Sequence, residues 1–212
     1  MRQNEEKVVL VTQERNSVML QKYLLRKPLS KNQVDDMVDG LVNVMRYADS
    51  SILYPTDIES AQPNSGVDPE WIYPIYNGSN AFSELSAIHM YTTQEAAFED
   101  IGQLMLGIGI VEMQHYGKLS EFIRAIGGTL EHSYDNEEVE MGSTPEEALR
   151  IALDGEEKTI EFYESLAEKI ESVKQTPTTR IALQLVAKLR ADELIHVKLL
   201  RKKLETYGSK EK

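Results

Sequence analysis

Hydrophobic residues beyond about residue 80 recur in alternating steps of four and three, which places them on one face of an α-helix. This pattern predicts four helices, over about 80–96, 98–126, 144–173 and 177–206. Apolar faces of this kind pack against one another in a helix bundle. We therefore predict an all-α protein with a four-helix bundle over residues 79–208, followed by a short tail over 209–212.

Residues at the helix ends support these boundaries. Ser79 or Asn80 is a suitable N-cap for the first helix, because its side-chain oxygen can accept a hydrogen bond from a free backbone N–H. Gly127 suits the end of the second helix, since glycine adopts the left-handed conformation that ends many helices. Ser143 is the predicted N-cap of the third helix, with Pro145 in the first turn.

Residues 1–78 are predicted to form an N-terminal extension of the bundle. The spacing of hydrophobic residues predicts one or two helices there: one over about 31–48, preceded by a short amphipathic stretch from Ser17 to Leu25. Residues 49–79 hold four prolines and several aromatic residues, which predicts a long irregular connection. We interpret this connection as a segment that packs across a bundle or subunit surface. The alternative is a lid over a functional site.

Two of the four apolar faces carry a Glu and a His in the middle, where apolar residues would stabilise a core more. Glu112 and His115 lie on the second helix, and Glu193 and His196 lie on the fourth. Residues three apart on a helix differ by about 60° around the axis and by roughly 4.5 Å along it. Each Glu and its His therefore point the same way and can hold one metal ion.

The other two helices each carry one inward-facing Glu, which is Glu84 on the first and Glu156 on the third. An internal repeat supports both assignments, and it favours Glu156 over Glu157. It indicates two helical hairpins related by a pseudo-twofold axis. The repeated spacing is that of Glu84, Ile88 and Tyr91, which matches Glu156, Ile160 and Tyr163.

Four carboxylates in a bundle interior would be unfavourable without a partner, because burial disfavours the charged form and the charges repel one another. Two divalent cations balance the charge of four carboxylates. One Glu from each of two helices, with Glu-x-x-His from each of the other two, is the ligand set of dinuclear iron and manganese bundle proteins. The predicted metal ligands are Glu84, Glu112, His115, Glu156, Glu193 and His196. Carboxylates and imidazoles suit two Fe or two Mn ions and do not choose between them.

Two further pairs of residues lie near these positions. Tyr91 follows Glu84 by two turns, and Tyr163 follows Glu156 by two turns. We interpret them as core packing, with a hydrogen bond to a ligand as the alternative. Gly107 and Gly109 lie inside the second helix, where glycine costs about 1 kcal/mol relative to alanine. Close approach of another segment is one explanation, and room for a small ligand is the other.

Composition narrows the classes of function. The chain has 212 residues and a net charge of −12, which argues against binding to nucleic acid or to an anionic membrane. It contains no Cys, which excludes disulfides and thiolate-ligated metal sites within it. The apolar run near the start, Val8 to Val11, is too short for a secretion signal or a membrane span. We expect a cytoplasmic location.

The chain resembles the ferritin-like superfamily, and within it the rubrerythrin and manganese catalase branches. This resemblance implies Glu84 and Glu156 as terminal or bridging carboxylates, Glu112 and Glu193 as bridging or chelating ones, and one His per metal. Rubrerythrins also carry a cysteine-ligated electron-delivery domain, which this chain lacks. The segments that carry the resemblance are Glu84-Leu-Ser-Ala-Ile-His-Met-Tyr91, Glu112-Met-Gln-His115, Glu156-Glu-Lys-Thr-Ile-Glu-Phe-Tyr163 and Glu193-Leu-Ile-His196.

Three functions are compatible with such a centre. The first is an oxidoreductase of peroxidase or catalase type that acts on peroxide or O₂, with a separate electron donor if it is a peroxidase. The second is an iron-binding protein that oxidises and stores iron. The third is a non-catalytic assembly protein that keeps the fold. The aromatic residues of 49–79 favour a homo-oligomer in each case.

Overall fold

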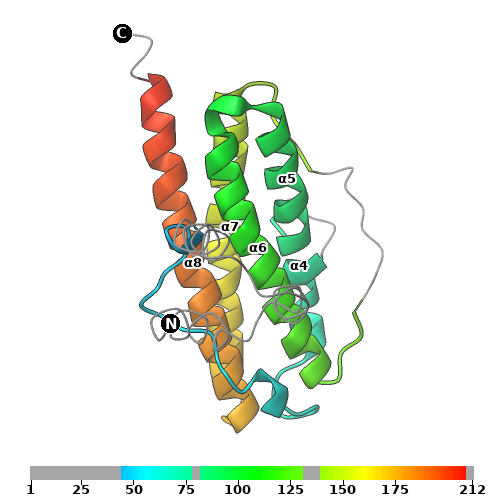
Figure 1. Cartoon of the computed structure of the whole chain (residues 1–212). Helices are drawn as coiled ribbons and strands as arrows, with labels where there is room; N and C mark the ends of the chain where they lie inside the picture. Colours follow the sequence, from blue (N-terminus) through cyan, green and yellow to red (C-terminus); the bar gives the residue numbers. More distant parts are fainter. Residues whose placement is uncertain (1–43, 78–81, 131–138, 209–212) are drawn as a thin grey trace, which may run out of the picture. The chain divides into compact units, whose positions relative to one another are not determined.

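Four long helices lie side by side in the computed structural model (Figure 1), which describes residues 44–77, 82–130 and 139–208. The chain divides after Val42 into two compact units, and all described residues belong to the second. The described residues form no strand, which confirms the all-α prediction. The long helices are α5 (Glu84–Ala97), α6 (Glu99–Ala125), α7 (Pro145–Glu171) and α8 (Pro177–Gly208).

The first bundle helix begins later than predicted. Ser83 is the N-cap of α5, where its hydroxyl accepts a hydrogen bond from the backbone N–H of Ser86 at 3.3 Å. The predicted caps Ser79 and Asn80 lie outside the described residues. The end of α6 is as predicted, since Gly127 follows it with a φ of 83°, a conformation that favours glycine.

The N-cap of α7 is Thr144, one residue after the predicted Ser143. The Thr144 hydroxyl accepts from the backbone N–H of Glu147 at 3.2 Å. The reason is that a residue directly before proline is held in an extended conformation, which is also the conformation of an N-cap. Since Pro145 is the first residue of the helix, the cap has to be the residue next to it.

The bundle consists of two helical hairpins, α5 with α6 and α7 with α8. The end of α6 lies beside the irregular N-terminal segment, where the backbone N–H of Thr129 donates to the Tyr73 hydroxyl at 2.9 Å. The start of α7 lies instead beside the end of α5, where Gln94 Nε2 donates to the Ala148 carbonyl at 3.3 Å. The two hairpins are thus arranged as the internal repeat predicted, with α6 and α7 running in the same direction (Figure 1).

Two apolar clusters fill the bundle, and the Glu and His positions lie between them. On α6, Ile108 and Val111 belong to one cluster, and Leu119 and Phe122 belong to the other. On α6 and α8, Glu112, His115, Glu193 and His196 are buried together with the apolar residues that recur in steps of four and three. On α7 the buried face differs, because Ile160 is half-buried while Thr159 is buried. A helix packed on more than one neighbour buries a face wider than a single row of residues.

Residues 44–77 pack on the outside of the bundle, which confirms the packing interpretation of the irregular segment. Short helices form within it, η1 (Ile58–Ser60), η2 (Pro69–Trp71) and α4 (Tyr73–Asn77). Ile75 and Tyr76 are buried in one of the two apolar clusters. The predicted helix over 31–48 lies outside the described residues except at its end, where Val44 and Met45 are helical. The boundary predicted at residue 78 stays a prediction.

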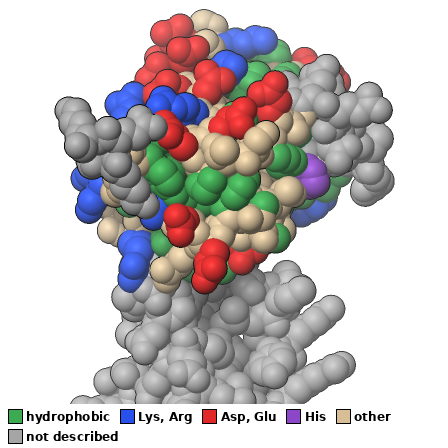
Figure 2. Space-filling model, turned by 90° about the horizontal axis from the view of Figure 1, so that it is seen from above, with side chains coloured by type: hydrophobic (Ala, Val, Ile, Leu, Met, Phe, Trp, Pro, Cys, Tyr) green, Lys and Arg blue, Asp and Glu red, His purple; other side chains and the backbone are tan. Residues whose placement is uncertain are grey.

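The surface is mixed in character. Figure 2 shows one end of the molecule, where acidic side chains border a small apolar strip. Along α6, three large apolar side chains are exposed at helical spacing, namely Leu106, Ile110 and Met113. Within the described part of the chain, no helix combines the length and the apolar character that a membrane crossing requires.

Candidate metal centre

All six predicted ligands are buried, at no more than 5% exposure, and they come from the four bundle helices. The apolar stripes bring them together, because each polar residue takes the place of an apolar one on a face that points inward. The side chains form two overlapping groups, and within each group one ligand atom per residue lies within 4.8 Å of the others.

The first group consists of Glu84, Glu112, His115 and Glu193. His115 Nδ1 lies 3.1 Å from Glu112 Oε2, 3.1 Å from Glu193 Oε1 and 3.4 Å from Glu84 Oε2. One imidazole nitrogen therefore faces three carboxylates from three helices. This arrangement can surround a single cation.

The second group consists of Glu112, Glu156, Glu193 and His196. His196 Nδ1 lies 2.7 Å from Glu193 Oε2, 2.9 Å from Glu112 Oε1 and 3.4 Å from Glu156 Oε1. Glu112 and Glu193 belong to both groups, and each offers one oxygen to each side. They are placed to bridge two ions, whereas Glu84 and Glu156 each serve one side.

The polar atoms of this cluster are incompletely satisfied by the described residues. Buried polar atoms in proteins nearly always have a hydrogen-bond partner, since losing water without compensation is costly. Here several ligand atoms have none, and all of them point into the cluster. They are Glu84 Oε2, Glu112 Oε1, both carboxylate oxygens of Glu193 and His196 Nδ1. A set of carboxylate and imidazole atoms of this kind fits divalent Fe or Mn.

The comparison with protein families agrees with this geometry. The model of the family described as Ferritin-like domain matches residues 79–205, more than half of the chain. The chain belongs to this ferritin-like family. Comparison with curated proteins gives no match. The fold and superfamily that the sequence predicted are confirmed, while the rubrerythrin and manganese catalase branches stay a prediction.

Protonation equilibria in this ferritin-like site reflect burial and mutual repulsion. Burial raises the pKa of Glu84 and of Glu156 well above the ordinary value of 4.5. Burial acts on Glu112 in the same direction, but the attraction of His115 and His196, together with the hydrogen bond to His115, outweighs it and lowers its pKa.

For the two imidazoles, burial lowers the pKa, whereas the neighbouring carboxylates raise it. Burial alone would lower the pKa of His196, yet Glu156 and Glu112 raise it well above 6.5. The pKa of His115 is likewise raised, because Tyr54 and the carboxylates, Glu193 first among them, outweigh its burial. Protons thus supply positive charge to the metal-free cluster, and a cation that binds there must displace them.

The two tyrosines of the repeat hydrogen-bond to predicted ligands, which corrects the prediction of plain core packing. Tyr91 donates its hydroxyl proton to Glu156 Oε1, and Tyr163 donates to Glu84 Oε1. Each tyrosine thus hydrogen-bonds to one Glu of the cluster on the other hairpin. Both side chains are buried, and burial raises the pKa of both phenols, so they remain protonated donors.

Sequence reasoning missed Asp192, which contacts the ring nitrogen of His115 that lies opposite the cluster. Asp192 Oδ2 lies 3.1 Å from His115 Nε2, the ring nitrogen that points away from the cluster. Lys188 Nζ donates to Asp192 Oδ1 at 2.6 Å, and both side chains are buried. Asp192 lies about 100° away from Glu193 around the helix, outside the apolar stripe. The only sequence signal was its pairing with Lys188 four residues earlier.

Residues of the segment that precedes η1 contact both Asp192 and Lys188. The backbone N–H of Asp49 donates to Asp192 Oδ1 at 2.6 Å, and the Asp49 carbonyl accepts from Lys188 Nζ at 2.6 Å. The Tyr54 hydroxyl donates to Asp192 Oδ2 at 3.3 Å, and the Tyr54 ring lies 5.2 Å from Lys188 Nζ. The segment therefore packs on the bundle and also covers one side of the candidate centre, so the alternative of a cover over a functional site applies to it as well.

Close packing explains the two glycines of α6. A Cβ on Gly107 would overlap the ring of Tyr47, and a Cβ on Gly109 would lie 3.1 Å from Tyr91 Cβ. The structure thus favours the close-approach explanation. Substitution at Gly107 requires Tyr47 to move.

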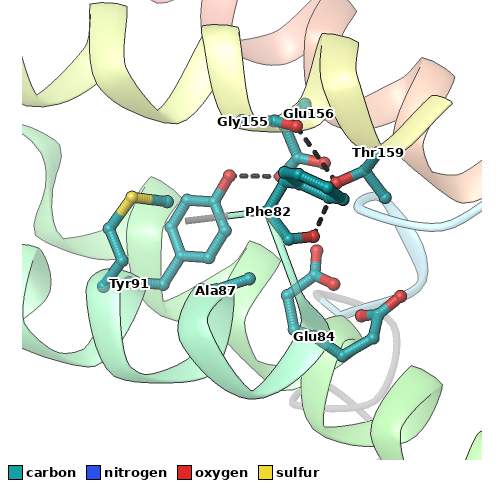
Figure 3. Close-up of a pocket in the computed structure, with 9 residues that line it drawn as sticks. Phe82, Glu84, Ala87, Tyr91, Gly155, Glu156 and Thr159 are labelled. Carbon is teal, nitrogen blue, oxygen red and sulfur yellow. Dashed lines mark hydrogen bonds between the residues drawn. The ribbon is translucent and has the colours of Figure 1, made fainter. Parts of the chain in front are cut away.

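A small cavity of about 10 Å³ lies between α5 and α7 at the edge of the cluster (Figure 3). Its volume corresponds to roughly one water molecule. Figure 3 shows Tyr91 reaching across it from α5 to Glu156 on α7, with Glu84 nearby. The Thr159 hydroxyl donates at 3.0 Å to the Phe82 carbonyl, which fixes the wall beside Glu84. Only a very small molecule fits beside these carboxylates without rearrangement.

Proposed function

We propose that this ferritin-like protein binds two Fe or two Mn ions and acts on peroxide or O₂. The observation that carries the proposal is the pair of buried ligand groups that share Glu112 and Glu193. Bound Fe or Mn ions would supply the change of oxidation state that reactions of peroxide and O₂ require. Zinc does not change oxidation state, and an all-carboxylate calcium site would not include histidines.

The residues of the chain would support this chemistry in three ways. Glu112 and Glu193 would hold both ions at a fixed separation, while Glu84 and Glu156 would each complete one side. Tyr91 and Tyr163 would orient these two outer carboxylates through their hydroxyl groups. The apolar clusters on both sides exclude bulk water, and the cavity beside Glu84 and Glu156 has room for about one water-sized molecule, so peroxide would require a small rearrangement of its walls.

We infer a catalase-type reaction as the first choice within this class. Two peroxide molecules then give two water molecules and one O₂, so no outside reductant is required. A peroxidase would need a separate electron donor, because a chain without Cys contains no thiolate-ligated redox centre. Turnover measurements distinguish the two reactions.

The test is peroxide turnover by protein loaded separately with Mn²⁺ and with Fe²⁺. Evolution of O₂ without added reductant supports the catalase, and peroxide loss that needs a reductant supports the peroxidase. Glu157→Gln is the matched control, because Glu157 neighbours a ligand yet pairs with Arg201 at the surface. Absence of both activities in both metal forms would refute the proposal.

Iron storage is the second candidate, and the family match favours it as well. A storage protein would form a large shell and take up many irons per chain. Size-exclusion chromatography with iron-loading measurements separates the two candidates. A small oligomer with two metals per chain supports the enzyme. If the purified protein contains only zinc and shows no redox activity in any metal form, it is a non-catalytic assembly protein.

We also infer that the protein self-associates. Leu106, Ile110 and Met113 expose 48%, 37% and 48% of their surface on one face of α6. Apolar side chains grouped in this way favour contact with another protein surface. Light scattering of the full chain measures the oligomeric state, and replacing Ile110 by Lys should reduce it.

A further inference from the structure

The two sides of the metal centre have equivalent ligands but different surroundings. On one side, His115 Nε2 is 3.1 Å from the Asp192 carboxylate. On the other side, His196 Nε2 is buried, and no described residue forms a hydrogen bond with it. The outer nitrogen of one imidazole is thus held by an acid, and that of the other has no protein partner in the described part of the chain.

The internal repeat explains this difference. Superposing Glu112 on Glu193 places Val111 at the position of Asp192 and Gly107 at the position of Lys188. Val111 is 1% exposed and has no hydrogen-bonding side chain. Gly107 leaves room for the ring of Tyr47, which packs against it. An apolar surface therefore stands where the other half has a buried acid and lysine.

Asp192 is held in place on the His115 side. Its Oδ1 accepts from Lys188 Nζ at 2.6 Å and from the backbone N–H of Asp49 at 2.6 Å. Its Oδ2 faces His115 Nε2 and the Tyr54 hydroxyl. An ionised carboxylate only accepts hydrogen bonds, so His115 donates from Nε2. The Nδ1 lone pair of a neutral His115 is then directed at the carboxylate cluster, and the negative partner makes that nitrogen a stronger ligand.

We propose that Asp192 makes the two metal positions unequal, so that the position beside His115 fills first and holds its ion more tightly than the position beside His196. Asp192 is a positioning residue in this proposal, because it acts through His115. The inference rests on the proposed dinuclear centre. Removing such a partner of a ligating histidine typically costs 10–100-fold in metal affinity, and the inequality should be of this order.

The first experiment uses the unaltered protein, crystallised with one equivalent of Mn²⁺ per chain. Anomalous scattering locates the ion. We expect most of the density beside His115 Nδ1 and little beside His196 Nδ1. Equal density at the two positions, or more beside His196, would overturn the inference. If no Mn²⁺ binds to either position, the proposed dinuclear centre fails as well, and the two failures are therefore distinguishable.

The second experiment compares Asp192→Asn in two backgrounds that each keep one imidazole. In His196→Gln, where His115 remains, Asp192→Asn should weaken Mn²⁺ binding by about 10–100-fold. In the His115→Gln background, the histidine through which Asp192 acts is missing, so Asp192→Asn should have no effect on the dissociation constant for Mn²⁺. Asparagine keeps the size of the side chain, and circular dichroism reports the helix content of each variant. An equal loss of affinity in both backgrounds would show a general effect on the fold and refute the inference.

Discussion

Replacing Glu193 by Gln should remove both metal ions and, with them, the stabilisation that they give. Glu193 is fully buried and offers one oxygen to each half of the centre, at 3.1 Å from His115 Nδ1 and 2.7 Å from His196 Nδ1. Glutamine has the same shape but no charge, and its amide nitrogen cannot bind a cation. The variant therefore keeps Glu112 as the only carboxylate shared by both halves, and a neutral amide replaces the charged group that faced both ions.

The size of the effect follows from the stabilisation of a folded state by its ligands. Each ion at a free concentration of 100 times its dissociation constant contributes about 2.7 kcal/mol, and two ions about 5 kcal/mol. In a domain of this size, 1 kcal/mol changes the melting temperature by about 2–4 °C. Metal should therefore raise the melting temperature of the unaltered protein by about 10–20 °C. The metal-free variant should be at least as stable as the metal-free protein, because it buries one carboxylate fewer.

Thermal unfolding followed by circular dichroism, with and without Mn²⁺, measures this difference, and elemental analysis gives the metals per chain. Glu157→Gln serves as the control, and its metal-induced shift should equal that of the unaltered protein. If Glu193→Gln keeps two metals per chain and the full shift in melting temperature, the assignment of Glu193 as a bridging ligand is wrong.

Three further predictions concern individual parts of the site. Glu156→Gln should lower the metal content from two ions to one by elemental analysis. Tyr163→Phe should keep both ions but weaken the one beside Glu84 in chelator competition, because that carboxylate loses its donor. The ordinary pKa is 4.5 for Glu and 6.5 for His, and in the folded protein the pKa values of Glu84 and His196 are raised. Such a group contributes fully to stability below its ordinary pKa, and the contribution is lost as the pH rises through the raised pKa. The metal-free protein should therefore lose stability as the pH rises above about 6.5, while Mn²⁺ binding, which displaces protons, becomes tighter. Melting curves with chelator or Mn²⁺ at several pH values test both trends.

The residues of the candidate site were predictable because they violate a regular pattern. The apolar stripes of α6 and α8 fix which way each residue faces, so Glu112 and Glu193 stood out as acids at inward positions. The structure brings all six predicted residues together. The repeat also favoured Glu156 over Glu157, and Glu156 is the one that lies in the buried cluster, whereas Glu157 pairs with Arg201 at the surface.

Two features could not be read from the sequence. Asp192 lies off the apolar stripe and is buried only because another segment covers it, so periodicity carries no sign of its role. The path of residues 44–77 is set by contacts with distant helices, such as that of Asp49 with Lys188. Local pattern does not encode which distant partner a segment meets. The shift of the N-cap from Ser143 to Thr144 was accessible, since the residue before proline is restricted.

The inequality of the two halves follows from the way the chain is built. A repeated pair of hairpins presents two equivalent faces, but residues 44–77 occur once and cannot contact both faces in the same way. Lys188 and Asp192 can be buried only where the backbone of Asp49 supplies an acceptor and a donor for them. On the equivalent face of α6 the same segment offers the ring of Tyr47, which requires Gly107 beneath it. The segment outside the bundle thus determines which histidine has an acidic partner, although it contributes no ligand itself.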